Sequence, residues 1–178
     1  MNIEARPAPA TWLRLREEPE NADIAAVRQM VESTGFFSAD EVSIAVELVE
    51  ARLARGLASG YRFLFAEPLE GDDPAVAYTC YGEIPCTVGS YDLYWIAVRD
   101  AVRGRRIGHW LLAETEQRIR ALHGRQIYIE TSGRDLYAST QGFYARCGYE
   151  LVARLDDFYA DGDPKLVYTK RLSPVISD

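Results

Sequence analysis

The chain has 178 residues, of which 48% are hydrophobic and 26% charged, and its net charge is -7. This length suffices for one domain with its own hydrophobic core, without disulfides or a structural metal. The negative charge argues against general nucleic-acid binding, and no apolar run approaches the roughly 18 residues that a membrane span needs. The three cysteines lack the close paired spacing of a zinc site or a disulfide framework, so we expect reduced thiols.

The N-terminus lacks the basic start and the apolar stretch of a signal peptide. Pro7 and Pro9 favour a loose leader over residues 1–10. We therefore expect a cytoplasmic protein in which residues 1–178 form a single domain.

Apolar spacing and turn residues divide the first half of the chain into five elements. In chain order we expect a strand at 11–16, a helix capped by Asn21 and ended by Gly35, a helix from Ser38 to about Gly56, and strands at 61–66 and 75–81. Ser38 with Glu41 three residues later has the form of a capping box. The turn-forming residues 70–74 indicate that the two later strands form an antiparallel hairpin.

The second half predicts six more elements. These are a strand at 91–98, a helix at 108–122 stopped by Gly124, a strand at 126–131, a helix at 136–147 stopped by Gly148, and closing strands at 151–155 and 166–170. The resulting order is β-α-α-β-β-β-α-β-α-β-β. Because it combines antiparallel hairpins with a strand-helix-strand crossover, we expect an α/β protein, of the α+β mixed-sheet kind, with helices on both faces.

The segment 96–108 joins an apolar strand to the start of an amphipathic helix. Backbone N–H groups at a helix N-terminus and the helix dipole suit a pyrophosphate, and Gly104 and Gly108 permit close approach. Three arginines add positive charge: Arg103, Arg105 and Arg106. The alternative is a plain strand-to-helix turn with solvated arginines. Gly-x-x-x-x-Gly-Lys-Ser/Thr is absent, as is Gly-x-Gly-x-x-Gly before this helix, which argues against nucleotide hydrolysis and dinucleotide binding.

This loop resembles the acyl-CoA loop of the GNAT superfamily of N-acyltransferases, whose pattern is Arg or Gln, two residues, Gly, one residue, then Gly or Ala. Arg103 and Gly108 match it, whereas Arg106 stands where the family usually has its first Gly. A second segment, Phe-Tyr-Ala-Arg-Cys-Gly-Tyr at 143–149, is similar to the family's Phe-Tyr-x-x-x-Gly-Phe. Together these matches cover roughly residues 75–171.

The resemblance implies a central, mostly antiparallel sheet that splays open in a V beside the strand at 91–98. Exposed backbone of that strand would pair with the pantetheine arm of acetyl-CoA, and no metal is implied. Tyr137 stands where the family often has an Asn. The expected cofactor-binding residues are Ile96, Ala97, Val98, Arg103, Gly104, Arg105, Arg106, Ile107, Gly108, His109 and Tyr137.

In such enzymes a neutral amine attacks the thioester directly, so the protein orients two substrates, removes a proton and protonates the departing thiolate. Tyr144 matches the family's frequent general acid, and the alternative for it is packing in the core. Asp92 interrupts an apolar strand and is the candidate base. It could instead anchor the substrate ammonium or lie in water at a strand end. Glu130 and Glu83 are second choices.

These residues predict an N-acetyltransferase acting on a primary amine of a small molecule, an amino acid or a peptide, as a monomer or homodimer. The alternatives are a catalytically idle acyl-CoA-binding module and a generic interaction domain. The acidic segment 156–164, with aromatic Phe158 and Tyr159, could receive a cationic amine. It could also be a solvated acidic turn. We expect no nucleic-acid or membrane partner.

Overall fold

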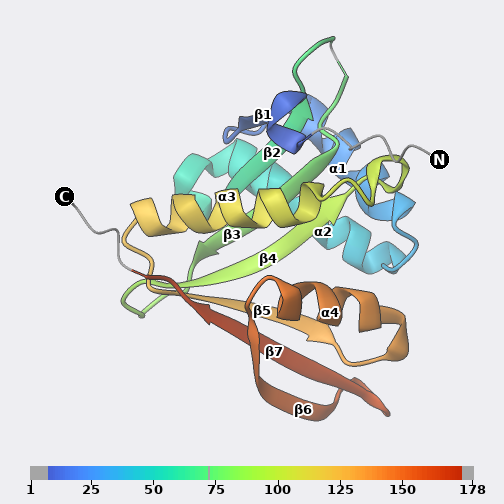
Figure 1. Cartoon of the computed structure of the whole chain (residues 1–178), viewed down its shortest axis with the longest axis vertical. Helices are drawn as coiled ribbons and strands as arrows, with labels where there is room; N and C mark the ends of the chain where they lie inside the picture. Colours follow the sequence, from blue (N-terminus) through green and yellow to red (C-terminus); the bar gives the residue numbers. More distant parts are fainter. Residues whose placement is uncertain (1–7, 72, 174–178) are drawn as a thin grey trace. The chain divides into compact units, whose positions relative to one another are not determined.

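The computed structural model describes residues 8–71 and 73–173, so most of the expected leader, residues 1–7, lies outside them. The elements follow the predicted order, and in the described residues one short 3-10 helix precedes β1 and three more lie between later elements. Their bounds are β1 Leu13–Arg16, α1 Asn21–Ser33, α2 Ala39–Arg55, β2 Arg62–Pro68, β3 Ala77–Glu83, β4 Ser90–Val98, α3 Ile107–Ala121, β5 Gln126–Ser132, α4 Ala138–Arg146, β6 Glu150–Ala160 and β7 Asp163–Arg171 (Figure 1).

The strands form a mixed sheet in the order β1-β2-β3-β4-β5-β7-β6. β4 and β5 are parallel, whereas β1 with β2, β5 with β7 and β6 with β7 are antiparallel. A parallel pair needs a long crossover, and α3 supplies it between β4 and β5. The predicted mixed α/β fold is therefore confirmed.

Two compact units can be distinguished within the chain. One contains the residues up to Cys80 together with Trp95–Thr115, and the other contains Tyr81–Tyr94 together with the residues from Glu116 onward. The division falls within β3, β4 and α3, so each of these elements contributes residues to both units. That the whole chain is one domain stays a prediction.

In the first unit, β2 explains why helices are needed on both faces of the sheet. Phe63 and Phe65 belong to a core cluster with residues of α1 and α2, whereas Leu64 and Ala66 belong to a cluster with Ile107 and Leu111 of α3. Successive side chains of a strand point to opposite faces, so a continuous apolar run must be covered twice. Among the described residues, no helix is both long and apolar enough to cross a bilayer.

The start of α2 confirms the predicted capping box. Ser38 Oγ accepts the N–H of Glu41 at 3.3 Å, and the Glu41 carboxylate accepts the N–H of Ser38 at 2.8 Å. The start of α1 differs from the prediction, because Asn21 is the first helical residue and not its cap. The Asp23 carboxylate accepts the N–H of Glu20 at 2.7 Å and is itself paired with Arg16 of β1 at 2.8 Å.

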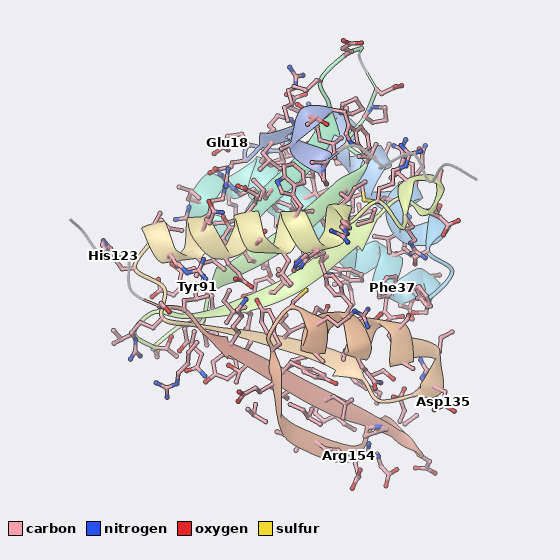
Figure 2. All side chains as sticks on the ribbon, in the orientation of Figure 1. Glu18, Phe37, Tyr91, His123, Asp135 and Arg154 are labelled. Carbon is pink, nitrogen blue, oxygen red and sulfur yellow. The ribbon has the colours of Figure 1, made fainter. Side chains whose placement is uncertain are left out.

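The turn after α3 corrects the role predicted for Gly124. The residue with left-handed backbone is His123, with φ of 63°. Gly124 is required for space, since a Cβ there would lie 2.3 Å from the Ile119 side chain and 2.9 Å from the Tyr91 ring. Figure 2 labels His123 just beyond the end of α3 and Tyr91 on β4. Close packing, rather than an unusual φ, therefore selects glycine at this position.

The last hairpin is longer than predicted. Strand β6 runs to Ala160 and β7 begins at Asp163, so most of the expected acidic turn at 156–164 is strand. Asp157, with φ of 52°, accepts the N–H of Gly162 at 2.7 Å, which closes the tip. The helix predicted at 136–147 begins instead at Ala138, after a 3-10 turn.

Candidate functional site

In the first unit, the chain passes from β4 through a short 3-10 turn into α3. Gly104 and Arg106 both have left-handed backbone, with φ of 73° and 61°. The Arg106 carbonyl accepts the N–H of Trp110 at 3.1 Å, so helical hydrogen bonding begins directly after it. The predicted anion-binding segment therefore lies at the N-terminus of a helix, where first-turn N–H groups have no carbonyl partner within the helix.

The conformation of Arg106 explains how this loop departs from the usual glycine pattern. A left-handed conformation costs a non-glycine residue roughly 1–2 kcal/mol. The chain thus keeps the backbone that a glycine would adopt while carrying an arginine side chain there. Arginine in place of the usual glycine therefore changes the charge of the loop but does not change the path of its backbone.

Two other loop arginines are held against the surface of the same unit. The Arg103 guanidinium lies 3.2 Å from the Asp100 carboxylate, 3.4 Å from the Val98 carbonyl and 5.3 Å from the centre of the Phe36 ring. The Arg105 guanidinium lies 5.6 Å from the centre of the Trp12 ring. Both charges are therefore kept beside the loop, which argues against fully solvated arginines.

The pairing between β4 and β5 determines which backbone groups of β4 are hydrogen-bonded to β5. The paired register joins Ser90, Tyr91 and Asp92 to Gln126, Ile127 and Tyr128. The predicted pantetheine contacts come later on the strand, where Ala97 is buried and Ile96 and Val98 are half-buried. The predicted V-shaped opening requires β4 and β5 to stop pairing along part of their length. Their paired register ends at Asp92, before the three predicted pantetheine contacts.

In the second unit, Asp92 lies half-buried on β4. Burial raises the pKa of its carboxyl, the negative Glu130 raises that pKa further, and the positive Lys165 lowers it. Glu130 is exposed and bound to Lys165, with 2.7 Å between carboxylate oxygen and Nζ. Glu83 is exposed at the end of β3, which extends two residues beyond the strand predicted at 75–81. A carboxyl with a raised pKa suits proton abstraction near neutral pH, which favours Asp92 over Glu130.

Tyr144 is buried on α4 within a group of aromatic rings. The centres of the Phe143, Tyr168 and Tyr149 rings lie 5.4, 5.9 and 6.2 Å from its own. Burial raises the pKa of its phenol well above the ordinary value, so the hydroxyl stays protonated at neutral pH. The ring therefore packs in the core, and the hydroxyl remains a neutral proton donor.

The segment before α4 holds Tyr137, which is buried. The Arg134 guanidinium lies 5.6 Å from the centre of the Tyr137 ring and 3.0 Å from the Asp163 carboxylate. Ser132 Oγ donates to the same carboxylate at 2.5 Å. These contacts attach the turn between β5 and α4 to the start of β7. His109, another predicted contact, is exposed in the first turn of α3.

One group of charged residues was missed by the sequence interpretation. Lys170 Nζ lies 2.8 and 2.9 Å from the two carboxylate oxygens of the buried Glu116, and 2.9 Å from the Cys147 carbonyl just after α4. Arg120 adds a contact to Glu116 at 3.3 Å. The signal was available, because Glu116 follows Leu112 by four residues and therefore falls on the apolar side of its helix.

A family model and a solved structure both match this chain, and both are acetyltransferases of the GNAT family. The family model described as an acetyltransferase (GNAT) domain matches residues 61–151. A solved structure from Desulfovibrio desulfuricans, assigned to the GNAT family of acetyltransferases, is 42% identical, with a TM-score of 0.86. That match covers 90% of this chain and 99% of the other.

More distant structures share the fold. The aminoglycoside 6'-N-acetyltransferase of Enterococcus faecium is 17% identical, with a TM-score of 0.68 and coverage of 92% of this chain and 99% of the other. The yncA protein of Salmonella typhimurium, solved with its cofactor acetyl-CoA, is 15% identical, with a TM-score of 0.66 and coverage of 93% and 96%. No curated protein matches the chain.

Proposed function

The chain belongs to the GNAT family of acetyltransferases, and on this premise we propose that it transfers an acetyl group from acetyl-CoA to a primary amine. The observation that carries the proposal is the loop before α3, where left-handed Gly104 and Arg106 lead into the first turn of a helix. Left-handed turns direct successive N–H groups toward one anion, and the helix dipole adds to that attraction.

The residues of the first unit fit the donor that the family uses. We propose that the N–H groups of residues 105–108, which follow left-handed Gly104, bind the pyrophosphate, with Arg103, Arg105 and Arg106 providing positive charge. The backbone of Ile96, Ala97 and Val98 would bind the pantetheine arm, since these residues follow the segment of β4 that is paired with β5. His109 is a further candidate contact in this unit, and Tyr137 is one in the second unit. Bound acetyl-CoA supplies the thioester whose acyl group is transferred.

In the proposed reaction, Asp92 accepts a proton from the substrate ammonium, and the free amine then attacks the thioester carbonyl. A nitrogen–carbon bond forms, the carbon–sulfur bond breaks, and Tyr144 donates its phenolic proton to the departing thiolate. The bonded nitrogen loses its second proton to water, and water returns a proton to the tyrosine, so that the net release for each amide formed is the one proton that Asp92 takes and passes to solvent. The raised pKa of Asp92 agrees with its role as the base, and the raised pKa of Tyr144 keeps its phenol protonated until the thiolate forms.

Two further roles remain proposals for the second unit. Glu130 would act on the amine through a water if Asp92 serves only as an ammonium anchor, although its contact with Lys165 must then open. The exposed acids of the β6–β7 hairpin favour a cationic acceptor. The name of the Enterococcus faecium structure refers to such an amine substrate, but at 17% identity the likeness extends to the fold alone.

The test is a screen of an amine library with acetyl-CoA that monitors release of free thiol, beside calorimetry with CoA alone. We expect CoA binding together with thiol release that depends on one class of amine. CoA binding without turnover on any amine would instead favour the idle acyl-CoA-binding module. Absence of CoA binding would contradict the assignment of the loop before α3.

A further inference from the structure

The second unit contains a buried ion pair that has no part in the proposed reaction. The Glu116 side chain is only 5% exposed, and Lys170 Nζ lies 2.8 and 2.9 Å from its two carboxylate oxygens. Taking both charges out of water costs free energy, so a buried pair is weak evidence for stability by itself. The pair is better explained if it holds neighbouring groups in one arrangement.

The ammonium of Lys170 has three N–H donors, and each of them has an acceptor within hydrogen-bonding distance. Two acceptors are the oxygens of Glu116, and the third is the Cys147 carbonyl, 2.9 Å from Nζ. Cys147 directly follows α4, so this bond holds the last turn of the helix, where a positive charge also interacts favourably with the helix dipole. Three bonds therefore fix the end of α4 against β7.

Tyr144 belongs to the turn that Lys170 holds. Its carbonyl accepts the N–H groups of Cys147 and Tyr149, each at 3.0 Å. The Lys170 ammonium lies 5.4 Å from the centre of the Tyr149 ring, and that centre lies 6.2 Å from the centre of the Tyr144 ring. Lys170 is therefore connected to Tyr144 both through the backbone and through an aromatic ring.

Strand β7 supplies a third connection. Tyr168 and Lys170 are two residues apart, so their side chains lie on the same face of the strand. The ring centres of Tyr168 and Tyr144 lie 5.9 Å apart, where α4 packs against β7 (Figure 1). Because aromatic pairs at this distance prefer particular orientations, a shift of the helix end along β7 would move the Tyr144 ring and its hydroxyl.

We propose that Lys170, held by Glu116, is a positioning residue that fixes the place of the Tyr144 hydroxyl. In this role Lys170 contacts no reacting atom and affects turnover only through Tyr144. The inference rests on the proposed function, in which Tyr144 donates a proton to the departing thiolate. A displacement of about 1 Å in such a site can lower the rate by up to roughly 100-fold, because proton transfer requires hydrogen-bonding reach.

The main test is a double-mutant cycle of Lys170→Met and Tyr144→Phe. Thiol release from acetyl-CoA is measured with the amine that gives the highest turnover in the library screen. Lys170→Met keeps much of the lysine stem but has no N–H donor, so kcat should fall about tenfold while the KM for acetyl-CoA stays within about twofold. In the Tyr144→Phe background the same change should alter kcat by less than about twofold, because the hydroxyl that Lys170 positions is absent.

A matched control separates position from stability. Arg52 of the first unit is also a buried cation, and its Nη2 lies 2.8 Å from each carboxylate oxygen of Glu18. Arg52→Met should therefore lower the melting temperature but keep kcat within about twofold. Circular dichroism checks that every variant is folded at the assay temperature. A loss of kcat in Arg52→Met as large as that in Lys170→Met would overturn the proposal.

Failure of the inference and failure of the proposed function give different results. If Tyr144→Phe has the turnover of the unmodified chain, or if the unmodified chain has none, the proton-donor role of Tyr144 fails and the inference fails with it. If Tyr144→Phe is slow but Lys170→Met lowers kcat by the same factor in both backgrounds, only the positioning role is overturned.

Lys170→Arg is the second variant, in case Lys170→Met does not fold. It keeps the positive charge, but the planar guanidinium directs its donors differently from an ammonium, so kcat should fall by about threefold. This loss should also disappear in the Tyr144→Phe background. A loss that persists there would contradict action through Tyr144.

Discussion

The loop before α3 and the carboxylates near β7 are built in different ways. The loop consists of consecutive residues whose backbone conformation is set locally, with left-handed Gly104 and Arg106 preceding the helix. By contrast, Asp92 comes from β4, Glu130 from β5 and Lys165 from β7, and their charges interact only because those strands belong to one sheet. A site made of backbone tolerates side-chain changes, whereas a site made of distant side chains depends on each of them.

The largest expected effect tests the side-chain site at Tyr144. Tyr144→Phe should lower kcat by about 10- to 1,000-fold and leave acetyl-CoA affinity nearly unchanged, because it removes a proton donor and keeps the ring. Steady-state kinetics and calorimetry measure the two quantities. Tyr168→Phe is the matched control, since it removes a hydroxyl from a neighbouring ring. Wild-type turnover in Tyr144→Phe would leave packing as the role of Tyr144.

The next effect concerns Asp92. A carboxyl whose pKa is raised loses its charge as the pH falls through that raised value, so the rate of the unmodified enzyme should decline at a higher pH than for an ordinary aspartate. Asp92→Asn should slow turnover by about 100-fold at neutral pH and recover partly as rising pH supplies free amine. CoA affinity should be nearly intact in calorimetry.

The same variant distinguishes the two roles of Asp92. If it is only an ammonium anchor, the KM for the amine should rise and kcat should change less. Acceptor kinetics that are unchanged at every pH would exclude both roles and direct attention to Glu130 and Glu83.

The Glu116–Lys170 pair tests whether distant side chains also hold α4 in place. Lys170→Met should lower the free energy of unfolding by about 2 kcal/mol, since it removes the lysine charge from the buried Glu116 and a donor from the Cys147 carbonyl. Chemical denaturation measures the loss. Lys170→Arg should recover part of it, and equal losses in both variants would indicate that the shape of the lysine, rather than its charge, matters.

For the backbone site, Gly108→Val should weaken CoA binding by about tenfold, because a β-branched residue obstructs approach to the first turn of α3. Arg105→Ala should weaken it by only about threefold, since one of several charges is lost. Ala113→Val, on an exposed position of the same helix, controls for helix propensity. A larger effect of Arg105→Ala in calorimetry would contradict the backbone argument.

The smallest expected effect is at Arg106. Arg106→Gly removes the strain of a left-handed arginine, but a glycine loses more conformational entropy when the chain folds. The net gain in stability should be about 0.5–1 kcal/mol. CoA affinity should change by less than about threefold, because the backbone is kept. Thermal unfolding and calorimetry check both. A loss of stability would mean that the Arg106 side chain makes contacts that outweigh its strain.

Local signals in the sequence were interpreted correctly where the interacting groups are close along the chain. The Ser38–Glu41 capping box is an example, as is the stop at Gly148, which has φ of 83°. The order of strands and helices also followed from apolar spacing. These features depend on hydrogen bonds or burial within a few residues, and such information is present in a short stretch of sequence.

Errors occurred where a residue distant in sequence decides the outcome. Asp23 is held at the start of α1 by Arg16 of β1, which a cap pattern centred on Asn21 cannot reveal. The acidic segment 156–164 is mostly the ends of β6 and β7, which pair at Leu155 with Lys165 and at Ala160 with Asp163. Composition alone favoured a turn, since the hydrogen bonds that make it a strand come from elsewhere.

The sequence by itself determined the family, the order of the elements and the position of the loop before α3, because a motif of consecutive residues carries its own backbone geometry. Only the tertiary structure decided that Asp92 has a raised pKa, that Glu130 is bound to Lys165, and that Glu116 is buried against Lys170. Burial and charge pairing depend on which strands and helices become neighbours, and that is a property of the folded chain.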